Sequence, residues 1–162
     1  MLQLIWLTCA VATVAAAVRA GRSPRAARIG RLAVGTLYLG AGALVNAAFL
    51  ASGEDYADFA DHAYIRFVRE TWEPLVVRNH LLFISLLVVF EAAVGVLVLS
   101  GGRRTQLGLT AAIAFHVALL SFGWWFYLWS IPMIGALSLL LRAERRPTAA
   151  LVELPVERSK AA

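Results

Sequence analysis

Three polar side chains stand out inside the long apolar stretches of this 162-residue sequence: the amide of Asn46, the carboxyl group of Glu91 and the imidazole of His116. Polar groups in such stretches are costly, and proteins keep them mainly where they are used. A carboxyl group and an imidazole can exchange protons with a bound molecule, and an amide beside them can donate and accept hydrogen bonds. We therefore take Glu91 and His116 as candidate catalytic residues and Asn46 as a candidate ligand-binding residue.

Glu91 could be either protonated or ionised. Burial alone favours the protonated acid, whereas an ion pair with His116 would keep both groups charged. Either state suits proton transfer at a bound ligand. The structural alternative is that Glu91 hydrogen-bonds a neighbouring helix and that His116 is a packing residue.

Further candidate ligand-binding residues lie beside the apolar stretches. Arg78, Asn79 and His80 precede the third stretch and could form a rim that touches an anionic head group or ligand. Trp124 and Trp125 belong to an aromatic cluster of the kind that favours the membrane–water interface. No spacing in the chain specifies a metal site or haem ligation by His80 and His116, so we expect neither.

The composition is that of a membrane protein. Hydrophobic residues make up 60% of the chain, charged residues only 15%, and the mean hydropathy is +0.74, whereas soluble domains carry about 25% charged residues. The net charge of +5 comes from arginines between apolar stretches, with no basic face carrying stacking aromatics, which excludes nucleic-acid binding. One cysteine excludes an internal disulfide or a paired-cysteine redox site, and we expect no cleaved signal peptide because basic residues follow the first apolar stretch.

The apolar stretches predict five membrane spans, at residues 2–18, 32–51, 81–99, 107–123 and 125–141. A span needs roughly 20 apolar residues. The region 107–141 has no charged residue and is long enough for two spans, with a turn at Gly123. Arginines cluster at 19–31, 103–104 and 142–146, and the positive-inside rule places all three clusters in the cytoplasm.

These spans predict an all-α, polytopic membrane helical bundle formed by a single transmembrane domain, residues 1–146. We expect a bacterial inner membrane protein with its N-terminus outside and its C-terminus, including a flexible tail at 147–162, in the cytoplasm. The acidic segment between the second and third spans is then outside. Its apolar residues recur at helical spacing and predict an amphipathic helix over 56–71, lying flat on the outer leaflet or over the mouth of the bundle.

The three intramembrane polar residues can converge. At about 1.5 Å per residue from the predicted outer ends of the spans, Asn46 lies about 8 Å deep, His116 about 9 Å and Glu91 about 15 Å. We therefore expect one chamber, open to the outside, under the amphipathic helix.

The stretch 90–109 begins with Phe90-Glu91 and a small-residue apolar helix, which ends in Gly101-Gly102-Arg103-Arg104 before a new apolar helix starts. It resembles the second helix and following turn of DoxX-like membrane proteins, and 31–46, with Leu39-Gly40-Ala41-Gly42, is similar to their first helix. The resemblance covers residues 30–142 and implies a four-helix core to which the first span is an addition. It also implies a membrane subunit of quinone-linked sulfur oxidation or of a redox-stress complex. Only Glu91 matches a distinctive family position, and Asn46 stands where the family often has a lysine.

The leading hypothesis is a DoxX-like protein that binds a small lipophilic ligand such as a quinone in the outer half of the bundle. Glu91 would handle protons, with His116 and Asn46 as hydrogen-bond partners. Lacking a redox cofactor motif, the chain would be the membrane subunit of a redox-linked complex with a partner membrane or extracytoplasmic protein. Two alternatives stay open: a non-enzymatic scaffold or accessory subunit, and an intramembrane enzyme that modifies a lipid by acid–base chemistry. Whether the chain is an enzyme stays open too.

Overall fold

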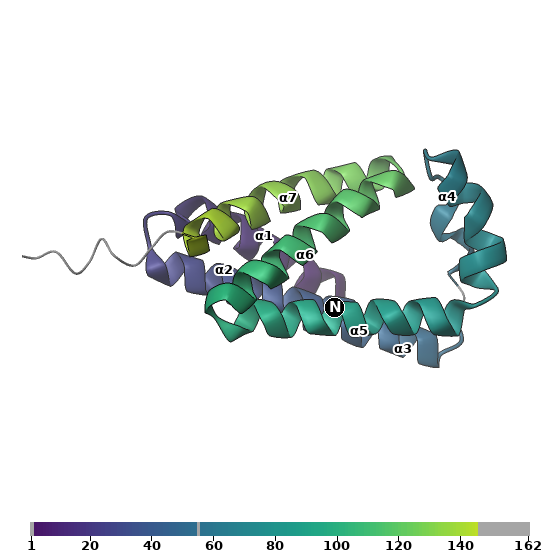
Figure 1. The fold of residues 1–162 in the computed structure, drawn as a ribbon, viewed down its shortest axis with the longest axis horizontal. Helices are drawn as coiled ribbons and strands as arrows, with labels where there is room; N and C mark the ends of the chain where they lie inside the picture. The colour runs from purple at the N-terminus through teal and green to yellow at the C-terminus, as the bar shows by residue number, and fades with distance from the viewer. Residues whose placement is uncertain (1, 55, 146–162) are drawn as a thin grey trace, which may run out of the picture.

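The computed structural model describes residues 2–54 and 56–145, and every regular element in them is helical (Figure 1). The predicted tail at 147–162 lies outside the described residues. The elements along the chain are α1 (Leu2–Ala20), α2 (Pro24–Thr36), the π-helix η1 (Leu37–Leu44), α3 (Val45–Ala51), the 3-10 helix η2 (Ala57–Ala60), α4 (Arg66–Thr71), the π-helix η3 (Trp72–Val77), α5 (His80–Ser100), α6 (Gly102–Leu119), the 3-10 helix η4 (Leu120–Phe122) and α7 (Trp124–Arg145).

Four helices have the length and composition to cross a membrane, and the chain is accordingly a multi-pass membrane protein. They are Pro24–Ala51, His80–Ser100, Gly102–Phe122 and Trp124–Arg145. The charge-free region near the C-terminus thus divides into two helices at Gly123, as the sequence predicts. The apolar helix Trp6–Ala20 is shorter, and a fifth crossing by α1 stays a prediction.

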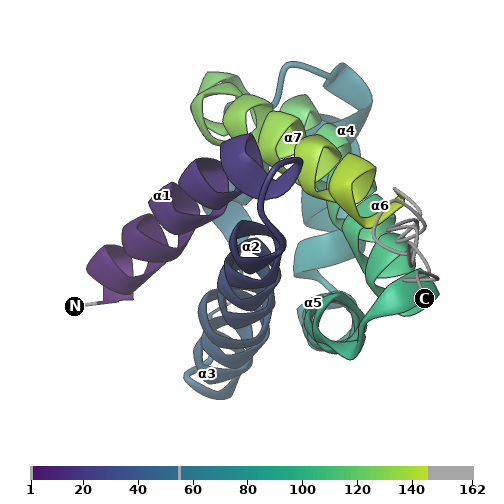
Figure 2. The same ribbon diagram turned by 90° about the vertical axis from the view of Figure 1, so that its left-hand side faces the viewer.

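The helices form two hairpins, α1 with α2 and α6 with α7, and α5 packs between α2 and α6. α1 lies against α2 and α7, and α6 lies against α5 and α7. The core between them contains Val34, Val98, Leu109 and Leu137, none of which is exposed. Toward its N-terminus α1 diverges from α2 and α3, as the end-on view shows (Figure 2).

The second helix begins at Pro24, well before the predicted start of its apolar stretch. Ser23 caps it, because the side chain accepts a hydrogen bond from the Ala26 N–H at 3.3 Å. Proline directly after the cap has the backbone angle that a first helical turn needs. The arginines at 19–31, which the predicted spans leave between the first and second helices, therefore lie largely on helices. We call the end of the bundle that holds Ser23, Gly101 and Arg145 the basic end.

The predicted amphipathic helix over 56–71 is wrong as a continuous helix. Only Ala57–Ala60 and Arg66–Thr71 are helical, and Tyr56 has a left-handed backbone with φ of 60°. Contact with the turn at Gly123 explains the break, because the His62 carbonyl oxygen lies 2.6 Å from where a Gly123 Cβ would stand. In a continuous helix that carbonyl would point along the helix axis and could not approach the turn.

The segment 52–79, which we call the cap segment, lies over the bundle end where α6 and α7 meet, the second of the two expected positions (Figure 1). Phe59 anchors it through ring contacts at centroid distances of 5.0 to 5.3 Å with Trp72, Phe122 and Phe126. Burying these rings favours packing on the bundle over a flat position in the lipid. We call this end the cap end.

Candidate functional site

Glu91 is a buried carboxyl group whose hydrogen-bonding partner is neutral. Its residue is only 6% exposed in the middle of α5. The Asn46 side chain, from α3, donates to Glu91 Oε2 at 2.8 Å. The predicted convergence of these two residues is therefore confirmed, and the amide satisfies one carboxyl oxygen without supplying a counter-charge.

Tyr56 links this pair to the cap segment. Its hydroxyl donates to Asn46 Oδ1 at 2.8 Å, and its backbone carbonyl accepts a hydrogen bond from the Trp72 indole at 2.9 Å. A left-handed backbone is uncommon outside glycine, and here these two contacts hold it. Burial, followed by the charges of Glu91 and Glu54, raises the pKa of the Tyr56 hydroxyl, so it remains a donor at neutral pH.

The π-helix η1 brings the second helix against Glu91. A π-helix is wider than an α-helix and is frequently found at functional sites. Gly42 within it leaves room for the carboxyl group, because a Cβ there would stand 2.7 Å from Glu91 Oε1. Any larger residue at this position would displace Glu91.

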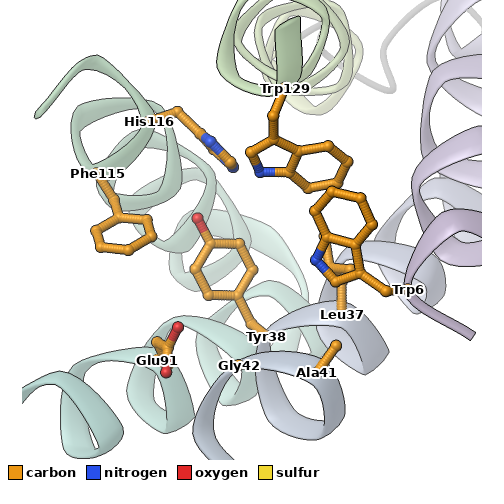
Figure 3. A pocket seen from close by; sticks show the side chains of 9 residues that line it. All are labelled: Trp6, Leu37, Tyr38, Ala41, Gly42, Glu91, Phe115, His116 and Trp129. Atoms are coloured by element: carbon orange, nitrogen blue, oxygen red, sulfur yellow. The ribbon is translucent and has the colours of Figure 1, made fainter. Parts of the chain in front are cut away.

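A cavity of about 80 Å³ opens beside Glu91. Its lining comes from α1, η1, α5, α6 and α7 (Figure 3). The lining residues are Trp6, Leu37, Tyr38, Ala41, Gly42, Glu91, Phe115, His116 and Trp129. Its size suits a few water molecules or one small polar group, and aromatic rings form most of the wall.

His116 shares this cavity with Glu91 but does not form an ion pair with it. In the described residues the ion pairs are Arg31–Glu144 and Arg66–Glu70. His116 Nδ1 lies 3.4 Å from the Ser130 hydroxyl, and its ring points into the cavity, between Tyr38 and Trp129 (Figure 3). Both groups thus face the same space from different helices.

The remaining predicted site residues do not line this cavity. Asn79 and His80 contact nearby backbone carbonyls, those of Leu75 at 2.8 Å and Val77 at 3.0 Å. Arg78 lies at the end of η3. Trp124 and Trp125 stack on each other with centroids 4.0 Å apart and are 48% and 62% exposed. Ligand contacts by these five residues stay predictions.

Five aromatic residues of the site are not among those predicted from the sequence. Tyr38, Trp6, Phe115 and Trp129 line the cavity, and Tyr56 reaches Asn46. The sequence does indicate Tyr38 as a candidate, because its side chain places a hydroxyl group inside an apolar stretch. In the structure this hydroxyl donates to the Ala112 carbonyl at 3.4 Å. The two tryptophans stack with centroids 3.6 Å apart, a pairing of distant segments that spacing does not reveal.

An apolar groove lies between α1 and α7, next to the cavity. Its volume is about 310 Å³, and Trp129 lines both spaces. The other groove residues are Ala10, Val11, Val14, Ala15, Leu128, Pro132 and Met133. Ala10 follows Trp6 by one helical turn, so the tryptophan pair stands between the polar cavity and the groove.

Metal-binding groups do not gather at this site. Among residues 2–54 and 56–145, no group of three or more His, Cys, Asp or Glu side chains is placed to hold a metal ion. The chemistry on offer is that of a carboxyl group, an imidazole, a phenol and an amide in an aromatic cavity. Comparisons with protein-family models, with curated proteins and with solved structures gave no match to this chain.

Proposed function

We propose that this chain binds the polar head of a small lipophilic ligand such as a quinone, with Glu91 as the group that exchanges a proton with it. The observation that carries the proposal is the buried Glu91 carboxyl, which has a neutral partner and faces a cavity. A buried carboxyl without a counter-charge is costly. A ligand oxygen in the cavity would give the carboxyl group a second polar partner beside Asn46.

Glu91 can bind either form of such a ligand. A protonated carboxyl donates to a carbonyl oxygen, and an ionised one accepts from a hydroxyl. Asn46 holds one carboxyl oxygen in place through both states, and His116 and Tyr38 offer further polar contacts in the same cavity. Reduction of a quinone to a hydroquinone takes two electrons and two protons. In a redox-linked complex, a partner protein would supply both electrons, Glu91 would pass one proton to the quinone oxygen in the cavity and be reprotonated from solvent, and the second oxygen would take its proton from solvent.

The dimensions of the two spaces favour a ligand with a polar head and an apolar tail. The cavity, at about 80 Å³, is smaller than the roughly 300 Å³ at which pockets for whole small molecules begin. The adjoining groove, at about 310 Å³, has an apolar lining and fits a hydrocarbon tail. Trp6 belongs to the helix that diverges from the bundle (Figure 2), so we infer that it moves aside when a ring enters.

The arginine clusters predict how the bundle is oriented in the membrane. Five spans in a bacterial inner membrane would place the cap end outside and the basic end in the cytoplasm. The Glu91 cavity then lies nearer the outer surface, below the cap segment. The resemblance of residues 30–142 to DoxX-like proteins agrees with a quinone-side membrane subunit.

The test is equilibrium binding of a short-chain benzoquinone to the purified chain in neutral detergent, followed by quenching of tryptophan fluorescence. The same titration with the reduced hydroquinone, kept free of oxygen, compares Glu91→Gln with the wild type. The hydroquinone hydroxyl donates to an ionised carboxylate in the wild type but only to a neutral amide in the variant, so we expect its affinity to fall roughly tenfold because a hydrogen bond to a charged group is lost. A quinone with an isoprenoid tail should bind the wild type more tightly than the tailless one.

The matched control is Glu73→Gln, the same chemical change at an exposed acid of the cap segment. It should bind like the wild type. If Glu91→Gln and Glu73→Gln bind equally well and Glu91→Gln only melts at a lower temperature, the scaffold alternative is the better account.

A further inference from the structure

A second polar cavity lies at the basic end. Its volume is about 420 Å³, between α2 and the turn from α5 to α6. Its lining residues are Arg28, Arg31, Leu32, Leu99, Ser100 and Gly101. It shares none of them with the Glu91 cavity, and the inference does not rest on the function proposed above.

The cavity carries an uncompensated positive charge. Arg28 and Arg31 are three residues apart on α2 and so share a helix face. Arg31 reaches Glu144 at 3.6 Å, which neutralises part of its charge. Arg28 has no acidic partner within residues 2–54 and 56–145.

The surroundings strengthen this charge. In the described residues the basic end holds one acid, Glu144, and nine arginines: Arg19, Arg22, Arg25, Arg28, Arg31, Arg103, Arg104, Arg142 and Arg145. Such a surplus of one sign raises the local concentration of anions.

The floor of the cavity is apolar. Leu32 is 51% exposed and Leu99 is 42% exposed, and both lie next to the arginines in helices of spanning length. A cavity with cationic side chains above exposed leucines matches an amphiphile at a membrane surface. A small soluble anion would use the arginines but gain nothing from the leucines.

We propose that this cavity binds the phosphate of an anionic membrane lipid. The guanidinium groups of Arg28 and Arg31 would contact the phosphate, since arginine pairs with phosphate through two parallel hydrogen bonds. Leu32 and Leu99 would lie against the start of the acyl chains. A free phosphate ion could also contact the two arginines, but it has no acyl chain to lie against the leucines.

The experiment counts lipids retained by the full chain in native mass spectrometry, after incubation in neutral detergent with equal amounts of phosphatidylglycerol and phosphatidylcholine. The wild type should retain phosphatidylglycerol preferentially. Arg28→Gln should lower that retention roughly fivefold, the usual effect of one basic residue near an anionic surface. Arg28→Lys should keep most of it.

The control is Arg22→Gln, which removes the same charge from the same end, in the turn between α1 and α2 and outside the cavity. It should retain phosphatidylglycerol like the wild type. Equal losses in Arg22→Gln and Arg28→Gln, or no preference for phosphatidylglycerol, would overturn the proposal.

A separate titration with inorganic phosphate tests whether the bound phosphate belongs to a lipid or to a free ion. Displacement of the lipid by millimolar phosphate would assign the cavity to a soluble anion and overturn the lipid assignment.

Discussion

Two glutamates with little exposure lie in different parts of this bundle, and their partners differ in kind. Glu144, at the basic end, lies 3.6 Å from the guanidinium group of Arg31, and its side chain is 15% exposed. Glu91, inside the bundle, accepts a hydrogen bond from the neutral amide of Asn46 and faces a cavity. Within the described residues, Glu144 has a counter-charge, whereas Glu91 has no cationic partner and lies beside a cavity.

The difference separates a structural acid from the one that we propose to be functional. An ion pair at the membrane edge is close to neutral in free energy and tolerates change. A carboxyl group held by an amide inside the membrane is costly unless something else uses it. Low exposure alone would not distinguish the two, so the kind of partner and the presence of a cavity decide.

The largest effect on ligand binding is expected at Gly42. A Cβ there would stand 2.7 Å from Glu91 Oε1, so Gly42→Ala should push the carboxyl group out of place. We expect a loss of about 1–3 kcal/mol in stability, as for other overpacked sites, and a clear loss of quinone affinity. Thermal melting in detergent and quinone titration measure the two effects.

Gly40 provides the control for this change, because it lies in the same π-helix and its Cβ position has open space, with no neighbouring described atom within 4 Å. Gly40→Ala should leave both stability and affinity close to the wild type. Equal damage from the two substitutions would mean that η1, and not the contact with Glu91, is sensitive to added bulk.

The next prediction concerns the partners of the two glutamates, Asn46 for Glu91 and Arg31 for Glu144. Asn46→Leu removes the amide from Glu91 and should cost about 1–3 kcal/mol, because a buried polar group is left without its partner. Arg31→Leu removes the partner of Glu144, which reaches water, and should cost less than about 1 kcal/mol. Melting temperatures of the two variants, measured side by side, check the order, and a larger loss for Arg31→Leu would contradict it.

A smaller effect is expected at Tyr56. Tyr56→Phe deletes the hydroxyl that donates to Asn46 and should cost about 0.5–1.5 kcal/mol. Tyr64→Phe is the control, since Tyr64 packs by its ring against Tyr127 and is 58% exposed. Hydrogen exchange of the cap segment should rise in the first variant alone if Tyr56 ties the cap segment to the bundle.

The smallest effect is the response to salt. High ionic strength screens exposed and partly exposed ion pairs but hardly alters a hydrogen bond inside the membrane. The small stability difference between Glu144→Gln and the wild type should therefore shrink in high salt, whereas the difference for Asn46→Leu should not. Melting curves at low and high salt give the comparison.

The sequence predicted the parts of the site that depend on local composition. Glu91, Asn46 and His116 stood out because their apolar neighbours make polar groups costly, and the structure brings Asn46 to Glu91 and His116 to the same cavity. Ser23 and Pro24 form a helix-start signal that precedes the apolar stretch, so the second helix begins before the stretch that predicts the span.

The missed parts depend on contacts between distant segments. The stacking of Trp6 on Trp129 and the width of η1 arise when the helices assemble, and no short pattern encodes them. The cap segment shows a competing effect: its apolar spacing fits one helix, but the burial of Phe59 on the α6–α7 turn favours a broken one.

The most direct test of the central claim is native mass spectrometry of the chain released gently from its own membranes, with no ligand added. We expect the wild type and Gly40→Ala to retain a lipophilic molecule that Gly42→Ala loses, since Gly42, unlike Gly40, lies against Glu91. A wild type that carries no such molecule, or equal retention by all three proteins, would contradict a ligand site at Glu91.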